Sequence, residues 1–133
     1  MPVRARITFG VVAALAAVTA VCAYAADNDL PPKFTNVSAS PARFCAKPSD
    51  KCSRTGTTIH FTISTPAKVI GDIRPRTSNI AGYHEFTRRF PAGANSVRLN
   101  DTRLTTGRWR FRLVGVNSVA ASGPSLINLR VIR

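Results

Sequence analysis

Apolar and polar positions alternate most regularly between Thr106 and Asn117, near the C-terminal end of the chain. A period of two residues is typical of a strand with one buried and one exposed face. Turn residues bound the stretch on both sides. We therefore predict a strand whose inner face anchors the core, with Trp109 as the only tryptophan. The core anchors are Trp109, Phe111, Leu113 and, from another strand, Phe61; the outer face carries Arg108, Arg110 and Arg112.

Further short stretches, separated by turns that contain proline or glycine, predict the other strands. They are residues 34–40, 57–64, 67–74, 83–90, 95–101 and 125–133. The first and the fourth of these alternate weakly and are expected at sheet edges. Pro41 either ends the first strand or moves the chain to the other sheet. His60 is expected on the solvated face of its strand. In residues 67–74 we expect Val69, Gly71 and Ile73 to face inward, with the reverse facing as the alternative.

These seven strands, with no helical period between them, predict an all-β fold: a single seven-stranded antiparallel sandwich in residues 34–133. Residues 1–25 have the features of a secretory signal peptide, because two arginines precede an apolar run and Ala23-Tyr24-Ala25 offers small residues to signal peptidase. A retained membrane anchor and lipidation at Cys22 are the alternatives. Residues 26–33 lack a periodic pattern and are expected to form a flexible lead-in. We expect a secreted protein, extracellular or held at the cell envelope.

Cys45 and Cys52 are the only cysteines outside the predicted signal peptide. An oxidising destination favours a disulfide between them, which would close a polar loop. A metal site is the alternative, but the two histidines, His60 and His84, do not stand at zinc-ligand spacing. We therefore predict a disulfide and neither a metal nor another cofactor.

The chain is strongly basic. Its 19 lysine and arginine residues against 6 acidic ones give a formal net charge of +13, which becomes +11 when Arg4 and Arg6 leave with residues 1–25. A GC-rich genome that favours arginine codons would explain this bias without any function. The second interpretation comes from the spacing, because Arg108, Arg110 and Arg112 would stand in a line with steps of about 6.8 Å.

Neighbouring strands are expected to add to this arginine line. Arg130 would come from the last strand, and Lys68 and Arg74 from the other neighbour, with Asp72 partly neutralising those two. Guanidinium groups bind phosphate and carboxylate oxygens, so an anionic cell-envelope polymer is a predicted partner: teichoic acid, lipopolysaccharide phosphates, acidic polysaccharide or extracellular nucleic acid. The alternative is that these side chains only solvate an exposed sheet face and prevent aggregation.

Enzyme activity is not expected. The acidic residues after residue 33 are Asp50, Asp72, Glu85 and Asp101, and none of them forms a recognisable catalytic pair in the sequence. No nucleophile elbow accompanies either histidine. Specific nucleic-acid recognition is not expected either, because no recognition motif or aromatic platform accompanies the charge. Membrane contact is expected only through the signal segment, and the sequence does not predict the oligomeric state.

The central stretch, Trp109-x-Phe111-x-Leu113-x-Gly115, followed by Ser122-Gly123-Pro124-Ser125, resembles the F strand and F–G loop of fibronectin type III domains. Residues 58–64, 67–69 and 104–107 are similar to segments of Ig-like modules in secreted actinobacterial proteins. The resemblance covers residues 34–133 and implies an Ig-like or fibronectin type III-like sandwich. Two features depart from it. Trp109 stands where these domains usually have a tyrosine, so its indole N–H needs a different carbonyl partner. The cysteines are also too close in sequence to form the inter-sheet disulfide of antibody domains.

Three functional hypotheses follow. The first is a non-catalytic secreted or cell-envelope module for protein or glycan interaction or structural support. The second is a binder of anionic cell-surface polymers through the arginine-rich sheet face. The third, from the enzyme class, is a small secreted hydrolase or inhibitor. An anionic cell-envelope polymer or another extracellular protein is the expected partner.

Overall fold

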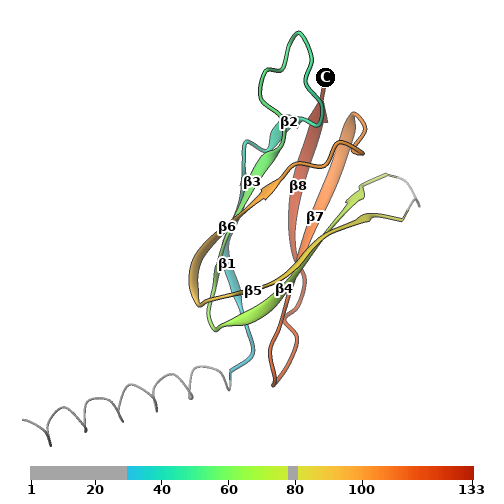
Figure 1. The fold of residues 1–133 in the computed structure, drawn as a ribbon. Coiled ribbons are helices and arrows are strands. Elements are labelled where there is room, and N and C mark those ends of the chain that lie inside the picture. The colour runs from blue at the N-terminus through green and yellow to red at the C-terminus, as the bar shows by residue number, and fades with distance from the viewer. Residues whose placement is uncertain (1–29, 78–80) are drawn as a thin grey trace, which may run out of the picture.

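The computed structural model describes residues 30–77 and 81–133, and it places two β-sheets face to face (Figure 1). One sheet has three strands in the order β1-β3-β6: β1 (Phe34–Ser40), β3 (Thr57–Ile63) and β6 (Gly93–Leu99). The other has five strands in the order β2-β8-β7-β4-β5: β2 (Arg43–Cys45), β8 (Ser125–Ile132), β7 (Gly107–Val116), β4 (Ala67–Pro75) and β5 (Tyr83–Phe90). The prediction of an all-β fold with two sheets is confirmed.

The predicted number of strands was wrong, because the described part of the chain has eight strands instead of seven. The additional strand, β2, has three residues, which is too short to show an alternating pattern. After Pro41 the chain leaves the three-stranded sheet, and β2 joins the five-stranded sheet beside β8. This pairing is parallel, so the sandwich is not antiparallel throughout.

The core lies between the two sheets and follows the alternation of the strands. The side chains of Trp109, Phe111 and Leu113 on β7 are 4%, 0% and 0% exposed to solvent. Phe61 of β3 approaches them from the opposite sheet and is 1% exposed. In β4 the inward residues are Val69, Gly71 and Ile73. A side chain at Gly71 would collide with the rings of Phe86 and Phe111, which stack with their centroids 6.1 Å apart.

The predicted disulfide between Cys45 and Cys52 is confirmed, with Cα atoms 6.2 Å apart. It closes the loop that follows β2, and Figure 1 shows this loop and the C-terminus at the same end of the molecule. Two backbone hydrogen bonds join Ser49 and Cys52 across the loop, at 3.0 and 3.1 Å. The loop is therefore held both covalently and by its backbone.

The predicted signal peptide and the first half of the predicted lead-in, residues 26–29, lie outside the described residues. Residues 30–33, the last part of that lead-in, contact the domain. The Lys33 backbone N–H donates to Ser64 Oγ at 2.8 Å, and the Ser64 N–H donates back to the Lys33 carbonyl at 3.0 Å. Within residues 30–77 and 81–133, no helix is long and apolar enough to cross a membrane.

Candidate functional site

The outer face of the five-stranded sheet gathers arginines from four neighbouring strands. On β7, Arg108 lies directly opposite Arg130 of β8, and Arg110 lies directly opposite Arg74 of β4. The short strand β2 adds Arg43 on the other side of Arg130. We call these five residues, Arg43, Arg74, Arg108, Arg110 and Arg130, the arginine cluster. The sequence predicted the arginine line of β7 with Arg130 and Arg74 beside it, and the register adds Arg43 through β2.

The geometry of paired strands sets the spacing within the arginine cluster. Directly opposite residues on antiparallel strands have Cα atoms about 4.5 to 5.5 Å apart, and the next outward residue on a strand is about 6.8 Å away. Four members of the cluster are exposed, and Arg110, in the middle, is half-buried. An extended anion could therefore meet several guanidinium groups at once.

No acidic side chain among the described residues forms a salt bridge with the arginine cluster. The salt bridges of the described residues involve Arg103, Arg112 and His84, and none of them reaches a member of the cluster. Like charges that are directly opposite on neighbouring strands destabilise a sheet. The pairs Arg108–Arg130 and Arg74–Arg110 therefore carry an electrostatic cost that a bound anion would relieve.

Arg112, although it continues the arginine line of β7, has a carboxylate partner. Its Nη2 lies 3.1 Å from Oδ2 of Asp72, which is its cross-strand neighbour on β4. Asp72 Oδ1 lies 3.1 Å from Nδ1 of His84, and His84 Nε2 lies 3.0 Å from the Thr87 hydroxyl. We expected Asp72 to neutralise Lys68 and Arg74, but it pairs with Arg112 instead. Arg112 therefore forms the border of the arginine cluster.

Lys68 shares the outer face but lies away from the arginine cluster. It is six residues before Arg74 on β4, which corresponds to about 20 Å along a strand, and its cross-strand neighbours are Val116 and Arg89. Between Lys68 and Arg74, β4 presents Ile70 opposite Val114 and then Asp72 opposite Arg112; the 53% exposed Leu126 lies on the other side of Arg112. The face is thus divided into a basic part and a largely apolar part.

A second polar cluster joins β5 to the loop after β6. Asp101 accepts three hydrogen bonds from Arg103: from the backbone N–H and Nε to Oδ1, each at 2.9 Å, and from Nη2 to Oδ2 at 2.8 Å. Arg103 Nη2 also lies 3.9 Å from Oε1 of Glu85. The Arg103 guanidinium stands 4.1 Å from the ring centroid of Tyr83. Sequence reasoning found no pair among the acids, because Glu85 lies on β5 and Asp101 in the loop after β6.

The environment of this cluster shifts the pKa values of the two carboxyl groups in opposite directions. Burial, followed by hydrogen bonding to Asp101, raises the pKa of Glu85 to about 8. The hydrogen bond from Arg103 is the largest effect on Asp101 and holds its pKa well below the usual range. Glu85 is therefore protonated at neutral pH and can donate to the Asp101 carboxylate. Arg103 compensates the Asp101 carboxylate, while Oε1 of Glu85 is buried without a hydrogen-bond partner among the described residues. This arrangement suits a structural contact between β5 and the loop.

Trp109 finds the hydrogen-bond partner that its indole requires. Its Nε1 donates to the carbonyl oxygen of Thr105, four residues earlier, at 2.8 Å. Its ring also stacks on Tyr83, with centroids 6.2 Å apart and an angle of 24° between the planes. The indole therefore fixes the start of β7, and with it the outward direction of Arg108 and Arg110.

His60 lies exposed on the outer face of β3. In the part of the chain that the structure describes, no three histidine, cysteine, aspartate or glutamate side chains gather as a metal site would require. No family model, curated protein or solved structure matches this chain.

Proposed function

We propose that this chain is an exported, non-catalytic Ig-like β-sandwich module that binds an anionic polymer of the cell envelope through the arginine cluster. One observation carries the proposal. Five arginines from four adjacent strands share one exposed sheet face, and no salt bridge of the described residues neutralises them. A surface of this kind attracts polyanions over a distance and binds them through several contacts.

The order of the strands supports the Ig-like part of the proposal. Ig-like sandwiches place strands A, B and E in one sheet and C, F and G in the other. The sheet β1-β3-β6 matches the first set in chain order, and β4, β7 and β8 match the second, with β5 added beside β4 as the C′ strand is in variable-type domains. The bond from Trp109 to Thr105 takes the place of the tyrosine corner on strand F.

The disulfide supports export, because such bonds persist in oxidising compartments and are rare in the cytosol. An exported basic module meets phosphate-, sulfate- and carboxylate-bearing polymers at the cell surface. Guanidinium groups present a planar fork of N–H donors that matches these oxyanions. The flat, extended shape of the arginine cluster suits a polymer with repeated charges better than a single small anion.

The apolar part of the same face favours a second candidate, namely docking to another extracellular protein. Leu126 of β8 is 53% exposed and lies opposite Arg112, and Ile70 of β4 lies opposite Val114, the next outward residue of β7. Exposed apolar residues beside arginines are typical of protein interfaces. In this case the apolar part would make the contact and the arginine cluster would form its rim.

Binding to immobilised wall teichoic acid and to dextran sulfate, with neutral dextran as a blank, tests the proposal. The face variant carries Arg108→Gln, Arg110→Gln and Arg130→Gln. We expect it to bind more than about tenfold more weakly near physiological salt, because each charge-assisted hydrogen bond contributes about 1.5 to 3 kcal/mol. The affinity of the unchanged protein should fall steeply with added salt.

A matched control separates a specific site from net charge. Lys33→Gln, Lys47→Gln and Arg88→Gln remove the same number of charges from exposed positions outside the arginine cluster. We expect this control variant to keep its affinity within about twofold to threefold, because exposed charges in salt are largely screened. Equal losses in the face and control variants would contradict a role for the arginine cluster and leave a plain structural module.

A further inference from the structure

A pocket of about 570 Å³ lies beneath the disulfide loop, at the same end of the molecule as the C-terminus. This volume lies within the range of small-ligand sites in proteins. Pro41, Phe44 and Ile132 contribute apolar surface, and the disulfide between Cys45 and Cys52 forms part of the wall. The pocket is outside the arginine cluster except for Arg43, which touches both.

Four basic side chains line this pocket, and none of its lining residues is acidic. Arg43 comes from β2, Lys51 and Arg54 from the disulfide loop and the turn after it, and Arg98 from β6. The salt bridges of residues 30–77 and 81–133 involve none of these four. Cations from three separate segments therefore converge on one hollow without a carboxylate to neutralise them.

Hydrogen bonds hold the wall of the pocket in place. Arg98 Nη2 donates to the carbonyl oxygen of Thr55, and the Thr55 hydroxyl donates to Asn100 Oδ1 at 3.3 Å. The Gly56 N–H donates to the Cys45 carbonyl at 2.8 Å. Gly56 has a φ of +77°, and a side chain there would collide with the Leu99 carbonyl oxygen. The chain therefore passes tightly against β6 as it leaves the loop, which keeps Arg54 close to Arg98.

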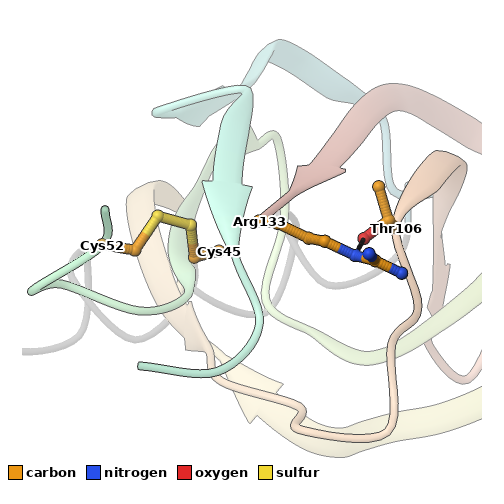
Figure 2. Close-up of a disulfide and its surroundings, with 4 residues drawn as sticks. All are labelled: Cys45, Cys52, Thr106 and Arg133. Atoms are coloured by element: carbon orange, nitrogen blue, oxygen red, sulfur yellow. Dashed lines mark hydrogen bonds between the residues drawn. A yellow bond between two sulfur atoms is a disulfide. The ribbon is translucent and has the colours of Figure 1, made fainter. Parts of the chain in front are cut away.

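The disulfide fixes the other side of the pocket. Cys52 stands directly after Lys51 and two residues before Arg54, and its bond to Cys45 ties both cations to the end of β2. Figure 2 shows this bond bridging the loop to β2, and it also shows Arg133 reaching toward Thr106. Arg133 Nε donates to Thr106 Oγ1 at 3.3 Å, so this neighbouring arginine is engaged elsewhere.

We propose that the pocket beneath the disulfide loop is a second anion-binding site, which takes a compact ligand bearing two or more phosphate or sulfate groups. Four converging cations exceed what one monovalent group can satisfy, whereas clustered tetrahedral oxyanions can accept hydrogen bonds from all of them. The apolar surface of Pro41 and Phe44 leaves room for the body of a phosphorylated or sulfated sugar. This site does not depend on polymer binding by the arginine cluster.

The probe is inorganic tripolyphosphate. Calorimetry near physiological salt measures its affinity for the protein, and changes in amide chemical shifts in NMR spectra locate where it binds. We expect one saturable site, with the largest shifts at residues 43–45, 51–56 and 98. Inorganic sulfate, which offers a single group, should compete only at concentrations at least about tenfold higher, since it forms fewer charge-assisted bonds. Shifts confined to the outer face of the five-stranded sheet would overturn the proposal.

The pocket variant carries Lys51→Gln and Arg54→Gln, two exposed side chains that make no hydrogen bond in the described structure, so the fold should persist. We expect it to bind tripolyphosphate more than about tenfold more weakly. The variant with Arg108→Gln, Arg110→Gln and Arg130→Gln loses more charge but should stay within about threefold of the unchanged protein, because its substitutions lie outside the pocket. An equal or larger loss in that variant would show that tripolyphosphate follows net charge, and it would overturn the pocket.

These measurements separate the two proposals. If the pocket is not an anion site, the pocket variant will bind tripolyphosphate as tightly as the unchanged protein, whether or not the face variant loses affinity for teichoic acid. If the arginine cluster is not the polymer site, the face variant will keep its affinity for teichoic acid, while the pocket variant will still have a lower affinity for tripolyphosphate. A third variant, Arg98→Gln, adds a check from β6. It should weaken tripolyphosphate binding by about threefold to tenfold, and an unchanged affinity there, together with an unchanged pocket variant, would overturn the site.

Discussion

The two outer faces of the sandwich meet the same solvent with different side chains. On the three-stranded sheet, β3 presents Thr58, His60 and Thr62, and β6 presents Ser96 opposite His60 and a single arginine, Arg98, opposite Thr58. On the five-stranded sheet, the equivalent outward positions carry the arginine cluster. Threonine on an exposed strand is favourable for sheet formation and carries no charge. The three-stranded sheet therefore covers most of its outer face with small or uncharged side chains, and Arg98 lies at the end of β6.

This difference bears on the simplest explanation of the charge. A preference for arginine codons would act on both outer faces alike, yet the outer face of β3 and β6 carries one arginine, Arg98, whereas β7 alone has three. Solvation alone would not place arginines directly opposite one another, since this arrangement costs stability. The contrast between the faces therefore favours a requirement that is specific to the five-stranded sheet, and a bound anion would meet it.

The largest expected effect tests the alternation on which this comparison rests. Trp109 lies between Arg108 and Arg110 and points into the core with 4% exposure. Trp109→Ala should lower the free energy of unfolding by about 3 to 5 kcal/mol, because it leaves a cavity and removes a large apolar surface. Chemical denaturation measures this loss. The control is Arg108→Ala, an exposed position where a change of about 0.5 kcal/mol or less is expected. Similar losses in both variants would show that β7 does not alternate as described.

The next prediction moves charge from one outer face to the other. The face variant with Arg108→Gln, Arg110→Gln and Arg130→Gln can receive Ser38→Arg, Thr62→Arg and Ser96→Arg on the three-stranded sheet. The net charge then returns to that of the unchanged protein. We expect binding to wall teichoic acid to stay more than about tenfold weaker, because the contacts of the arginine cluster are not rebuilt.

Circular dichroism and thermal unfolding should first show that the transplanted variant keeps its fold. The substituted positions lie on the outer face of their sheet, where changes usually stay within about 0.5 kcal/mol each. Recovery of full affinity would mean that total charge, rather than its position, decides binding. The two outer faces would then be equivalent for ligand binding, which would contradict a specific role for the arginine cluster.

The strands of this fold could be predicted where their alternation is long enough to read. β7 has ten residues and β3 has seven, and the burial of both follows a period of two. β2 has three residues and forms only because β8 offers a free edge beside it, which is a tertiary cause. Pro41 gave the one usable signal, since a change of sheet was one of its two expected effects.

The candidate sites could be predicted only in part, because their members meet through strand pairing. The arginines of β7 are visible as a line in the sequence, but Arg43 joins them through β2, and the pairing of Asp72 with Arg112 depends on register. Glu85 and Asp101 are 16 residues apart in the sequence. The pairing of β4 with β5 is irregular between Gly71 and Asp72, so Glu85 has no directly opposite residue on β4. No local pattern in the sequence predicts such contacts.

A smaller effect concerns Glu85, an acidic residue that belongs to neither outer face. Its pKa in the folded state is raised from 4.5 to about 8 by burial and by Asp101. A raised pKa means that its protonated form stabilises the fold fully below about pH 4.5, and that this contribution is lost as the pH rises through about 8. Glu85→Gln keeps a neutral donor and cannot ionise.

The melting temperature of this variant relative to the unchanged protein should therefore increase between pH 5 and pH 9. Thermal unfolding at several pH values measures the difference. Asp50→Asn, which changes an exposed carboxylate in the disulfide loop, serves as the control and should show no such trend. A constant difference between Glu85→Gln and the unchanged protein across this range would mean that Glu85 does not hold a proton in the fold.

The smallest expected effect compares two arginines of the same outer face. Arg74 lies opposite Arg110, so Arg74→Gln removes a repulsion and should raise the free energy of unfolding by about 0.2 to 0.5 kcal/mol at low salt. Arg112 lies opposite Asp72 at 3.1 Å, so Arg112→Gln removes an attraction and should lower it by a similar amount. In 1 M salt the screening length is about 3 Å, and the effect at exposed Arg74 should nearly vanish. Precise denaturation curves at both salt concentrations measure these changes. A loss of stability in Arg74→Gln at low salt would show that the arginine cluster is compensated within the protein, and it would then have no need of an anionic ligand.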